Sequence, residues 1–326
     1  RARNRTVARL RPFTSTIFAE MTELAARHDA INLGQGYPDT DGPESMLAAA
    51  RQAIADGMNQ YPPGAGMAVL REAVAADRNR RYGTHLDPTA EVLITVGATE
   101  AISSTLLGLV EPGDEVVLIE PFYDSYAATV ALAGAVRRTA PLVPSGSGFR
   151  LDVDALRTAI TERTTMLVVN TPHNPTGTVF TDDEIRAIAE LACEHDLLVL
   201  SDEVYEHLVF DGRVHTPLSS LPGMWERTVT VSSAAKMINV TGWKIGWACG
   251  PADLIAGVRA AKQYLSFVGG APFQPAVAHA LTHEQNWVRE MASDLQSKRD
   301  VLHRALTDAG FDVFSGGGTY FLCADI

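Results

Sequence analysis

The chain has 326 residues, of which 46% are hydrophobic and 20% are charged. This length allows one large domain or a large domain with a smaller companion, and the composition excludes disordered, collagen-like and coiled-coil chains. The formal net charge is −12 at pH 7. Because so acidic a surface repels phosphate backbones and anionic lipid headgroups, we expect neither a nucleic-acid nor a membrane partner.

The cysteines and the first thirty residues bear on the cellular compartment. Cys193, Cys249 and Cys323 are an odd number without CxxC spacing, so neither a disulfide framework nor a zinc site is indicated, and no metal is expected. The first thirty residues are charged throughout and hold no apolar run long enough for a signal peptide or a spanning helix. These features favour a cytoplasmic protein.

The middle of the chain alternates short apolar runs with helix-like segments, as βαβ units do. The runs lack polar alternation, which is typical of strands covered on both faces of a parallel sheet. We therefore expect an α/β fold with a mostly parallel sheet. The expected strands are Val92–Val96, Glu115–Ile119, Thr165–Asn170, Leu197–Ser201, Thr228–Val231 and Ile245–Cys249.

The two ends of the chain differ from its middle. Residues 1–35 are basic and irregular, and long helical patterns dominate after residue 255. We expect a large domain over residues 36–255 and a smaller α+β domain formed by residues 1–35 and 256–326, which continues beyond Ile326. The elements expected there are helices Asp253–Tyr264 and Trp287–Ala309, a hairpin over Phe311–Ala324, and within it a strand over Thr319–Ala324.

Ligands of open α/β sheets bind at the carboxyl ends of strands, and two turns there are informative. Gly97-Ala98-Thr99 opens a helix directly after the first strand, and the free N–H groups of a helix start favour a phosphate. Pro172 and Pro175 fix a turn that holds Asn174. Either segment alone is more often a plain turn.

Four further side chains suggest chemistry. Asp202 directly follows an apolar strand, so its carboxylate needs a cationic partner if it is buried, and Tyr205 follows three residues later. A capping or salt-bridged aspartate is the common alternative. Lys236 lies among small and apolar residues, where partial burial would lower its pKa and make it a usable amine nucleophile, although a surface lysine is the usual case. Lys244 is a second cation at the same end.

One ligand uses all these groups. Pyridoxal phosphate needs a lysine for its Schiff base, an acid at its pyridine nitrogen, hydrogen-bond donors at its phenolic oxygen, an aromatic ring to stack on it and a phosphate cup. Each signal is weak alone, but the set favours this cofactor.

The order of the motifs adds a resemblance. From about Asn32 to Gly250 the series NLGQGYPD, NQYPPGAG, GATEA, PFYDSY, NTPHNPTG, SDEVY, SSAAK and TGWKIGW resembles the class I/II, fold-type I, pyridoxal-phosphate aminotransferases. Within them the chain is similar to the kynurenine/glutamine/methionine branch and to actinobacterial N-succinyldiaminopimelate aminotransferases. The resemblance implies a large domain with a mostly parallel, seven-stranded sheet between helices.

The resemblance also implies a reaction. An amino acid would give its amino group to the cofactor, and a 2-oxo acid, 2-oxoglutarate or pyruvate, would accept it in a ping-pong cycle. N-succinyl-diaminopimelate as donor would place the enzyme in diaminopimelate and lysine biosynthesis. The homodimer would be the smallest active unit, because Tyr61 would reach the phosphate bound by the neighbouring subunit.

The family's functional residues can be carried over by motif position. Lys236 would form the Schiff base and move a proton, and Asp202 would pair with the pyridinium nitrogen. Asn174 and Tyr205 would bind the phenolic oxygen, and Tyr123 would stack on the ring. The phosphate would be held by Gly97, Ala98, Thr99, Ser233 and Lys244, with Tyr61 from the partner, and the substrate would be bound by Gly36 and Asn174.

Two departures from the family pattern stand out. Many relatives have arginine where this chain has Lys244, whose ammonium still neutralises a phosphate but lacks the bidentate fork. The arginine that grips the substrate α-carboxylate in the family is expected beyond Ile326.

Three other functions use part of the same pattern. A nicotinamide dehydrogenase is disfavoured because Gly34-Gln35-Gly36 and Gly146-Ser147-Gly148 lack the third glycine and follow no expected strand. A non-catalytic cofactor-binding regulator would need a DNA-binding extension or a basic patch. A carbon–sulfur β-lyase or a decarboxylase would use the same lysine, because the cofactor carries the chemistry, so this alternative stays open.

Overall fold

The computed structural model describes residues 5–34 and 36–326, and one mixed sheet organises this part of the chain. The strand order is β1-β8-β7-β6-β5-β2-β3-β4. β2, β3, β5, β6 and β7 are mutually parallel, whereas β8 runs antiparallel to both β1 and β7. The strands are β1 Val92–Val96, β2 Glu115–Glu120, β3 Val136–Ser145, β4 Gly148–Leu151, β5 Thr164–Asn170, β6 Leu198–Asp202, β7 Thr228–Ser233 and β8 Ile245–Cys249.

This topology decides where a ligand can bind. β1, β5, β6 and β7 all end at one edge of the sheet, and the reversed strand β8 begins there. The turns that follow the parallel strands and the residue that precedes β8 are therefore neighbours, although they are spread over some 150 residues of sequence.

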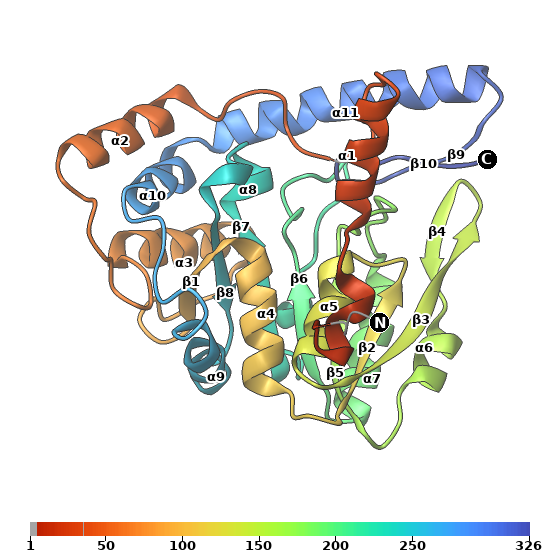
Figure 1. Ribbon diagram of the computed structural model, residues 1–326, viewed down its shortest axis with the longest axis horizontal. Helices are drawn as coiled ribbons and strands as arrows, with labels where there is room; N and C mark the ends of the chain where they lie inside the picture. The colour runs from red at the N-terminus through yellow and green to blue at the C-terminus, as the bar shows by residue number, and fades with distance from the viewer. Residues whose placement is uncertain (1–4, 35) are drawn as a thin grey trace.

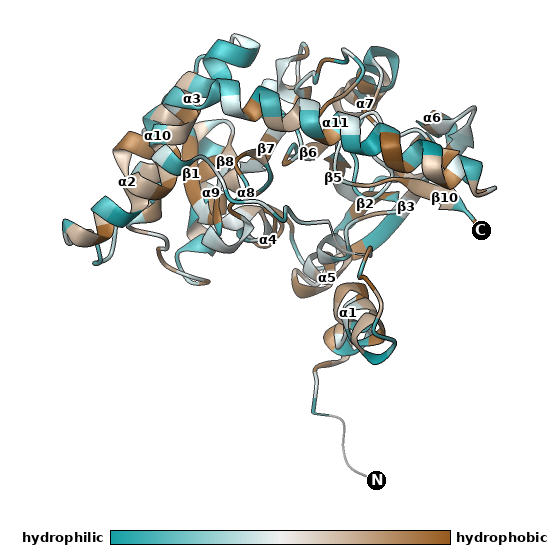
Figure 2. Cartoon of the chain, turned by 90° about the horizontal axis from the view of Figure 1, so that it is seen from above, coloured by the Kyte–Doolittle hydropathy of each residue, from teal (hydrophilic) through white to brown (hydrophobic). Residues whose placement is uncertain are grey.

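Helices cover both faces of the sheet, which explains the continuous apolar runs of its strands. On β2, Val116 and Leu118 pack into one core, and Val117 and Ile119 into another on the opposite face. α4 and α9 lie together on the first face, while α6 and α7 cover the second (Figure 1; Figure 2). The helices are α1 Ile17–Arg27, α2 Glu44–Ala55, α3 Ala68–Tyr82, α4 Gly97–Leu109, α5 Asp124–Leu132, α6 Val153–Ala159, α7 Asp182–Glu194, α8 Ala234–Met237, α9 Ala252–Lys262, α10 Phe273–His283 and α11 Gln285–Asp308, with 3-10 turns η1 Ala8–Phe13, η2 Leu218–Ser220, η3 Trp225–Arg227 and η4 Thr241–Trp243.

The end of the described chain forms a separate small layer. α11 runs above the main sheet, and β9 (Asp312–Phe314) and β10 (Cys323–Asp325) pair antiparallel beside it (Figure 1). α1 stands away from the body in the second view (Figure 2), and its Ile17 and Leu24 side chains are exposed. α9 packs on α4, and α10 packs on α2 and α3. The division at residues 35 and 255 stays a prediction.

Most expected elements are confirmed, and two expectations need correction. β1 and β8 have the predicted bounds, but the sheet has an eighth strand, because a hairpin of β3 and β4 adds one at the edge. The strand expected over Thr319–Ala324 is wrong for its first residues: Thr319 has φ +70°, which a strand cannot contain, and β10 begins only at Cys323. Among the described helices, none combines the length and the hydropathy that crossing a bilayer requires.

Candidate active site

A cavity of about 360 Å³ lies at the carboxyl ends of the parallel strands. The structure brings together there every predicted site residue except Tyr61. They are Gly36, Gly97, Ala98, Thr99, Tyr123, Asn174, Asp202, Tyr205, Ser233, Lys236 and Lys244.

One wall of the cavity is built to receive an anion. α4 begins at Gly97 directly after β1, so the N–H groups of its first turn face the cavity beside Lys244. Gly97 has φ +72°, and a Cβ atom there would lie 3.0 Å from Nζ of Lys244. A Cβ on Gly246 would lie 2.5 Å from the Gly97 carbonyl carbon. The two glycines thus let the start of β8 bring a lysine against the helix start.

Asp202 lies at the opposite wall as a buried acid. The phenol of Tyr126 donates a 2.5 Å hydrogen bond to its Oδ2, and the Val204 amide donates one of 3.2 Å to Oδ1. Burial raises the pKa of Asp202 to about 6, against the lowering effect of these two bonds. No lysine, arginine or histidine of the described residues forms an ion pair with it within 4.0 Å. The carboxylate is therefore ready to receive a cationic group from a ligand.

The turn after β5 is fixed to the strand that carries Asp202. The Asn170 side chain accepts a 2.7 Å hydrogen bond from the Asn174 amide and donates one of 2.9 Å to the carbonyl of Asp202. His173 is buried and contacts the Thr176 hydroxyl at 2.8 Å, and burial lowers the pKa of this histidine to about 4. The neutral imidazole of His173 and the side-chain amide of Asn170 therefore fix the turn that carries Asn174.

Lys236 lies between these walls on the short helix α8. Burial lowers the pKa of its amine to about 8, in the direction that the sequence predicts. Nζ donates a 2.7 Å hydrogen bond to the carbonyl of Gly36, and it lies 5.9 Å and 5.3 Å from the ring centroids of Tyr205 and Tyr320. Lys236 is thus an amine of lowered pKa inside a partly aromatic pocket.

Tyr61 lies elsewhere. Its side chain is 83% exposed, and its ring centroid is 5.5 Å from that of Phe267, in a shallow hollow lined by residues 59–62 and 268–273. Within one chain Tyr61 cannot contribute to the cavity, so its predicted role in a neighbouring subunit stays a prediction.

Sequence reasoning missed several cavity residues. Tyr126 follows Tyr123 by three positions, one turn along α5, and this spacing could have indicated that both face the same ligand. Asn170 ends an apolar strand, which is a signal of the same kind as Asp202. Phe18 on α1 and Phe321 near the end of the chain come from distant segments, and no local pattern identifies them.

Comparison with known proteins decides the family. Residues 28–326 match the family described as aminotransferase class I and II. The chain belongs to the class I and II aminotransferases. It is 64% identical over 320 residues to a probable N-succinyldiaminopimelate aminotransferase of Mycobacterium tuberculosis, with 98% of this chain and 81% of that protein covered.

Two other relatives support the same assignment. The methionine aminotransferase of Escherichia coli is 39% identical over 311 residues, covering 95% of this aminotransferase and 80% of the relative. The kynurenine–oxoglutarate transaminase 3 of Mus musculus is 37% identical over 334 residues, covering 98% and 73%. The resemblance to this branch, inferred from the motifs, is confirmed.

Solved structures agree with the sequence comparison. The structure of N-succinyldiaminopimelate aminotransferase from Mycobacterium tuberculosis superposes with a TM-score of 0.97, at 64% identity, covering 98% of this chain and 83% of that one. An aspartate aminotransferase from Thermus thermophilus with maleate gives a TM-score of 0.90 at 35% identity, covering 97% and 84%. The fold-type I architecture is therefore confirmed.

Proposed function

We propose that this aminotransferase exchanges the amino group of N-succinyl-diaminopimelate with 2-oxoglutarate, as a step in diaminopimelate and lysine biosynthesis. The observation that carries the proposal is the 64% identity, over 98% of the chain, to a relative described as a probable N-succinyldiaminopimelate aminotransferase. The methionine and kynurenine enzymes share 39% and 37%, so this substrate is favoured over theirs.

The cavity fits pyridoxal phosphate, the cofactor on which the family depends. Asp202 is a buried carboxylate that the described residues leave without a cation, and a protonated pyridine nitrogen supplies one. The start of α4 with Lys244 fits a phosphate. Lys236 would bind the cofactor's aldehyde, Tyr123 would stack on the ring, and the remaining contacts would come from Ala98, Thr99, Asn174, Tyr205 and Ser233.

Pyridoxal phosphate, when bound, supplies an electron sink for the carbanion at the substrate α-carbon. The chain's residues set the protonation that this chemistry needs. With a pKa near 8, about one-tenth of Lys236 is the neutral amine at pH 7, so it can act as a nucleophile and then carry a proton at Nζ. Asp202 would keep the ring nitrogen of the bound cofactor protonated, while Tyr205 stays protonated as a donor because burial raises its pKa well above the usual value.

We also propose that the active unit is a homodimer located in the cytoplasm. Tyr61, Tyr264 and Phe267 are large side chains that are more than half exposed, and such a surface is typical of an interface. Placed there, Tyr61 would contribute to the partner's phosphate site. The three cysteines are unpaired, which suits a reducing compartment.

The test is a donor comparison with the purified protein and pyridoxal phosphate. N-succinyl-diaminopimelate, methionine, kynurenine and glutamine are each supplied with 2-oxoglutarate, and glutamate formation is followed. We expect the highest kcat/KM with N-succinyl-diaminopimelate and no turnover in Lys236→Ala. A higher kcat/KM with methionine or kynurenine would overturn the proposal that N-succinyl-diaminopimelate is the amino donor. Release of pyruvate and ammonia from a cysteine conjugate, without glutamate, would favour the β-lyase alternative.

A further inference from the structure

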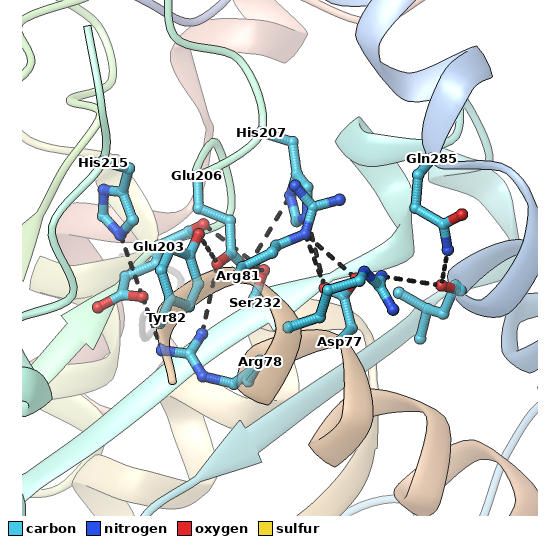
Figure 3. A network of polar contacts seen from close by, with 12 residues as sticks. Asp77, Arg78, Arg81, Tyr82, Glu203, Glu206, His207, His215, Ser232 and Gln285 are labelled. Carbon is cyan, nitrogen blue, oxygen red and sulfur yellow. Dashed lines mark hydrogen bonds and ion pairs between the residues drawn. The ribbon is translucent and has the colours of Figure 1, made fainter. Parts of the chain in front are cut away.

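The segment that follows β6 has two functional sides. Asp202 and Tyr205 line the cavity, whereas Glu203 and Glu206 are directed to Arg78 on α3 (Figure 3). The end of β7 is arranged in the same way. Ser233 lines the cavity, whereas the hydroxyl of its neighbour Ser232 donates a 2.6 Å hydrogen bond to Oε1 of Glu206. Glu203, Glu206 and Ser232 of the buried network are therefore adjacent in sequence to residues that line the cavity.

Arg78 is the centre of this network. It is 3% exposed; its Nη2 lies 3.2 Å from Oε2 of Glu203, and its Nη1 lies 3.4 Å from Oε2 of Glu206. The Tyr82 phenol donates a 2.7 Å hydrogen bond to the same oxygen of Glu206, and the guanidinium carbon lies 5.1 Å from the Tyr82 ring centroid. One cation thus joins two buried acids that are three residues apart.

Both acids are also held at their second oxygen. The Ser201 hydroxyl donates a 3.0 Å hydrogen bond to Oε1 of Glu203, as Ser232 does to Glu206. Burial alone would raise the pKa of Glu206, but the charges of His207 and Arg78 outweigh it and lower the pKa to about 2. Burial would likewise raise the pKa of Glu203, but the charges beside it, Arg78 first among them, outweigh burial and lower that pKa. The two carboxylates are therefore ionised and fixed from both sides at neutral pH.

The same cluster has the residue types of a metal site. Ligand atoms of Glu203, Glu206 and His215 lie within 4.8 Å of one another. Arg78, however, already contacts an oxygen of each acid, and its guanidinium keeps its proton at all physiological pH values. A divalent ion would have to share these oxygens with a permanent cation, so the geometry favours an arginine-bound carboxylate pair.

We propose that Arg78 is a positioning residue of the amino-transfer site, acting through Glu203 and Glu206 on the segment that directs Asp202 and Tyr205 into the cavity. The backbone supports this path, since the Glu203 amide donates to the Val231 carbonyl at 2.8 Å and the Glu206 amide donates to the Glu203 carbonyl at 2.8 Å. Without Arg78, the described basic groups that remain beside the two buried carboxylates are the imidazoles of His207 and His215, and the carboxylates must then move or take up protons. The inference rests on the proposed roles of Asp202 and Tyr205.

The test compares Arg78, which binds the segment after the carboxyl end of β6, with Arg227, which binds at the opposite end of β6 and β7. Arg227 precedes β7 and binds Asp196 at 2.8 Å and the Leu197 carbonyl at 3.3 Å, at the ends of β6 and β7 remote from the cavity. Arg78→Met and Arg227→Met are measured for three quantities: the thermal unfolding midpoint, the Kd of pyridoxal phosphate for the apoprotein, and the pH midpoint of the bound cofactor's visible absorbance.

We expect both variants to unfold at lower temperature, but only Arg78→Met to raise the Kd by roughly tenfold or more and to displace the absorbance midpoint. Lysine keeps the positive charge but lacks the two-pronged guanidinium, so the Kd and the absorbance midpoint of Arg78→Lys should fall between those of Arg78→Met and the wild type. If Arg78→Met does not fold, Glu206→Gln, which keeps the size and most hydrogen bonds, should show the same displacement.

Three results would overturn the proposal. The first is a Kd and an absorbance midpoint in Arg78→Met that match those of Arg227→Met. The second is a Kd of pyridoxal phosphate in Glu206→Gln equal to that of the wild type. The third is a stoichiometric divalent metal bound by the wild type and lost in Glu206→Gln. Cofactor binding is measured without substrate, so failure to accept N-succinyl-diaminopimelate would overturn the proposed function and leave this inference standing.

Discussion

The phenol of Tyr126 donates a 2.5 Å hydrogen bond to Oδ2 of Asp202, and both side chains are buried at the cavity wall. Burial raises the pKa of Tyr126 well above its usual value, so the tyrosine remains a donor at any working pH. One oxygen of Asp202 is thus committed to Tyr126. Because the Val204 amide holds the other oxygen, the carboxylate can rotate little.

Tyr126→Phe should weaken the site without opening it. The bond lowers the pKa of Asp202, so its loss raises that pKa further and makes the ionised carboxylate less available to a pyridinium nitrogen. A hydrogen bond to a charged group is worth about 1.5–3 kcal/mol, which corresponds to roughly a tenfold or greater rise in the Kd of pyridoxal phosphate. Equilibrium titration of the apoprotein checks this, and an unchanged Kd would show that Tyr126 only fills space.

Asp202→Asn should stabilise the apoprotein while impairing the enzyme. Burial raises the pKa of Asp202 from 3.8 to about 6, which corresponds to a cost of about 3 kcal/mol for the ionised form. For an acid whose folded pKa is raised, the cost is fully present above the folded pKa and absent below the unfolded one. The variant's advantage in free energy of unfolding should therefore be present at pH 8 and be mostly lost near pH 4.

Denaturant unfolding of wild type and Asp202→Asn at both pH values measures this difference, and groups common to both proteins cancel. Turnover should fall by orders of magnitude, because the ring nitrogen loses its counter-ion, as it should in Asp202→Ala. An apoprotein destabilised by Asp202→Asn at pH 8 would contradict the assignment of a carboxylate that lacks a cation.

The fold was largely predictable because the signals that specify it are local. β1 and β8 are uninterrupted apolar runs bounded by turns, and their bounds were predicted to the residue. β3 was missed because it is mostly exposed, carries Arg137 and Arg138, and contains Pro141 and Pro144, which together resemble a loop. Its place near the sheet edge makes that composition tolerable.

The site was predictable where its residues follow strands, and it was not where contacts are long-range. Asp202 could be singled out because a carboxylate at the end of a buried strand is costly without a partner. Its partner Tyr126 is 76 residues away, and Glu203 meets Arg78 at a separation of 125 residues. Such pairs depend on the packing of α3 and α5, which no local pattern encodes.

The low pKa of Lys236 predicts the pH dependence of cofactor capture. For a lysine whose pKa is lowered to about 8, the neutral amine predominates above that pH, and the rate of covalent capture should rise with pH and level off above about 8. Stopped-flow absorbance of apoprotein mixed with pyridoxal phosphate gives the profile. Lys236→Ala should show no covalent phase and no turnover while keeping its fold; a midpoint near 10 would mean that burial does not tune this amine.

Gly97 tests whether the start of α4 and Lys244 bind the phosphate, and Gly83 serves as the control for backbone strain. Gly97 has φ +72° and would bring a Cβ atom to 3.0 Å from Nζ of Lys244, whereas Gly83, at φ +69°, has open space around that position. Alanine at either site costs about 1–2 kcal/mol for the left-handed backbone, so both variants should lose similar stability. Only Gly97→Ala should displace the lysine and weaken pyridoxal-phosphate binding, by roughly tenfold.

Measuring both Kd values with the unfolding midpoints separates the loss of stability from the loss of cofactor binding. Equal Kd values in the two variants would mean that the phosphate is not bound between Lys244 and the start of α4.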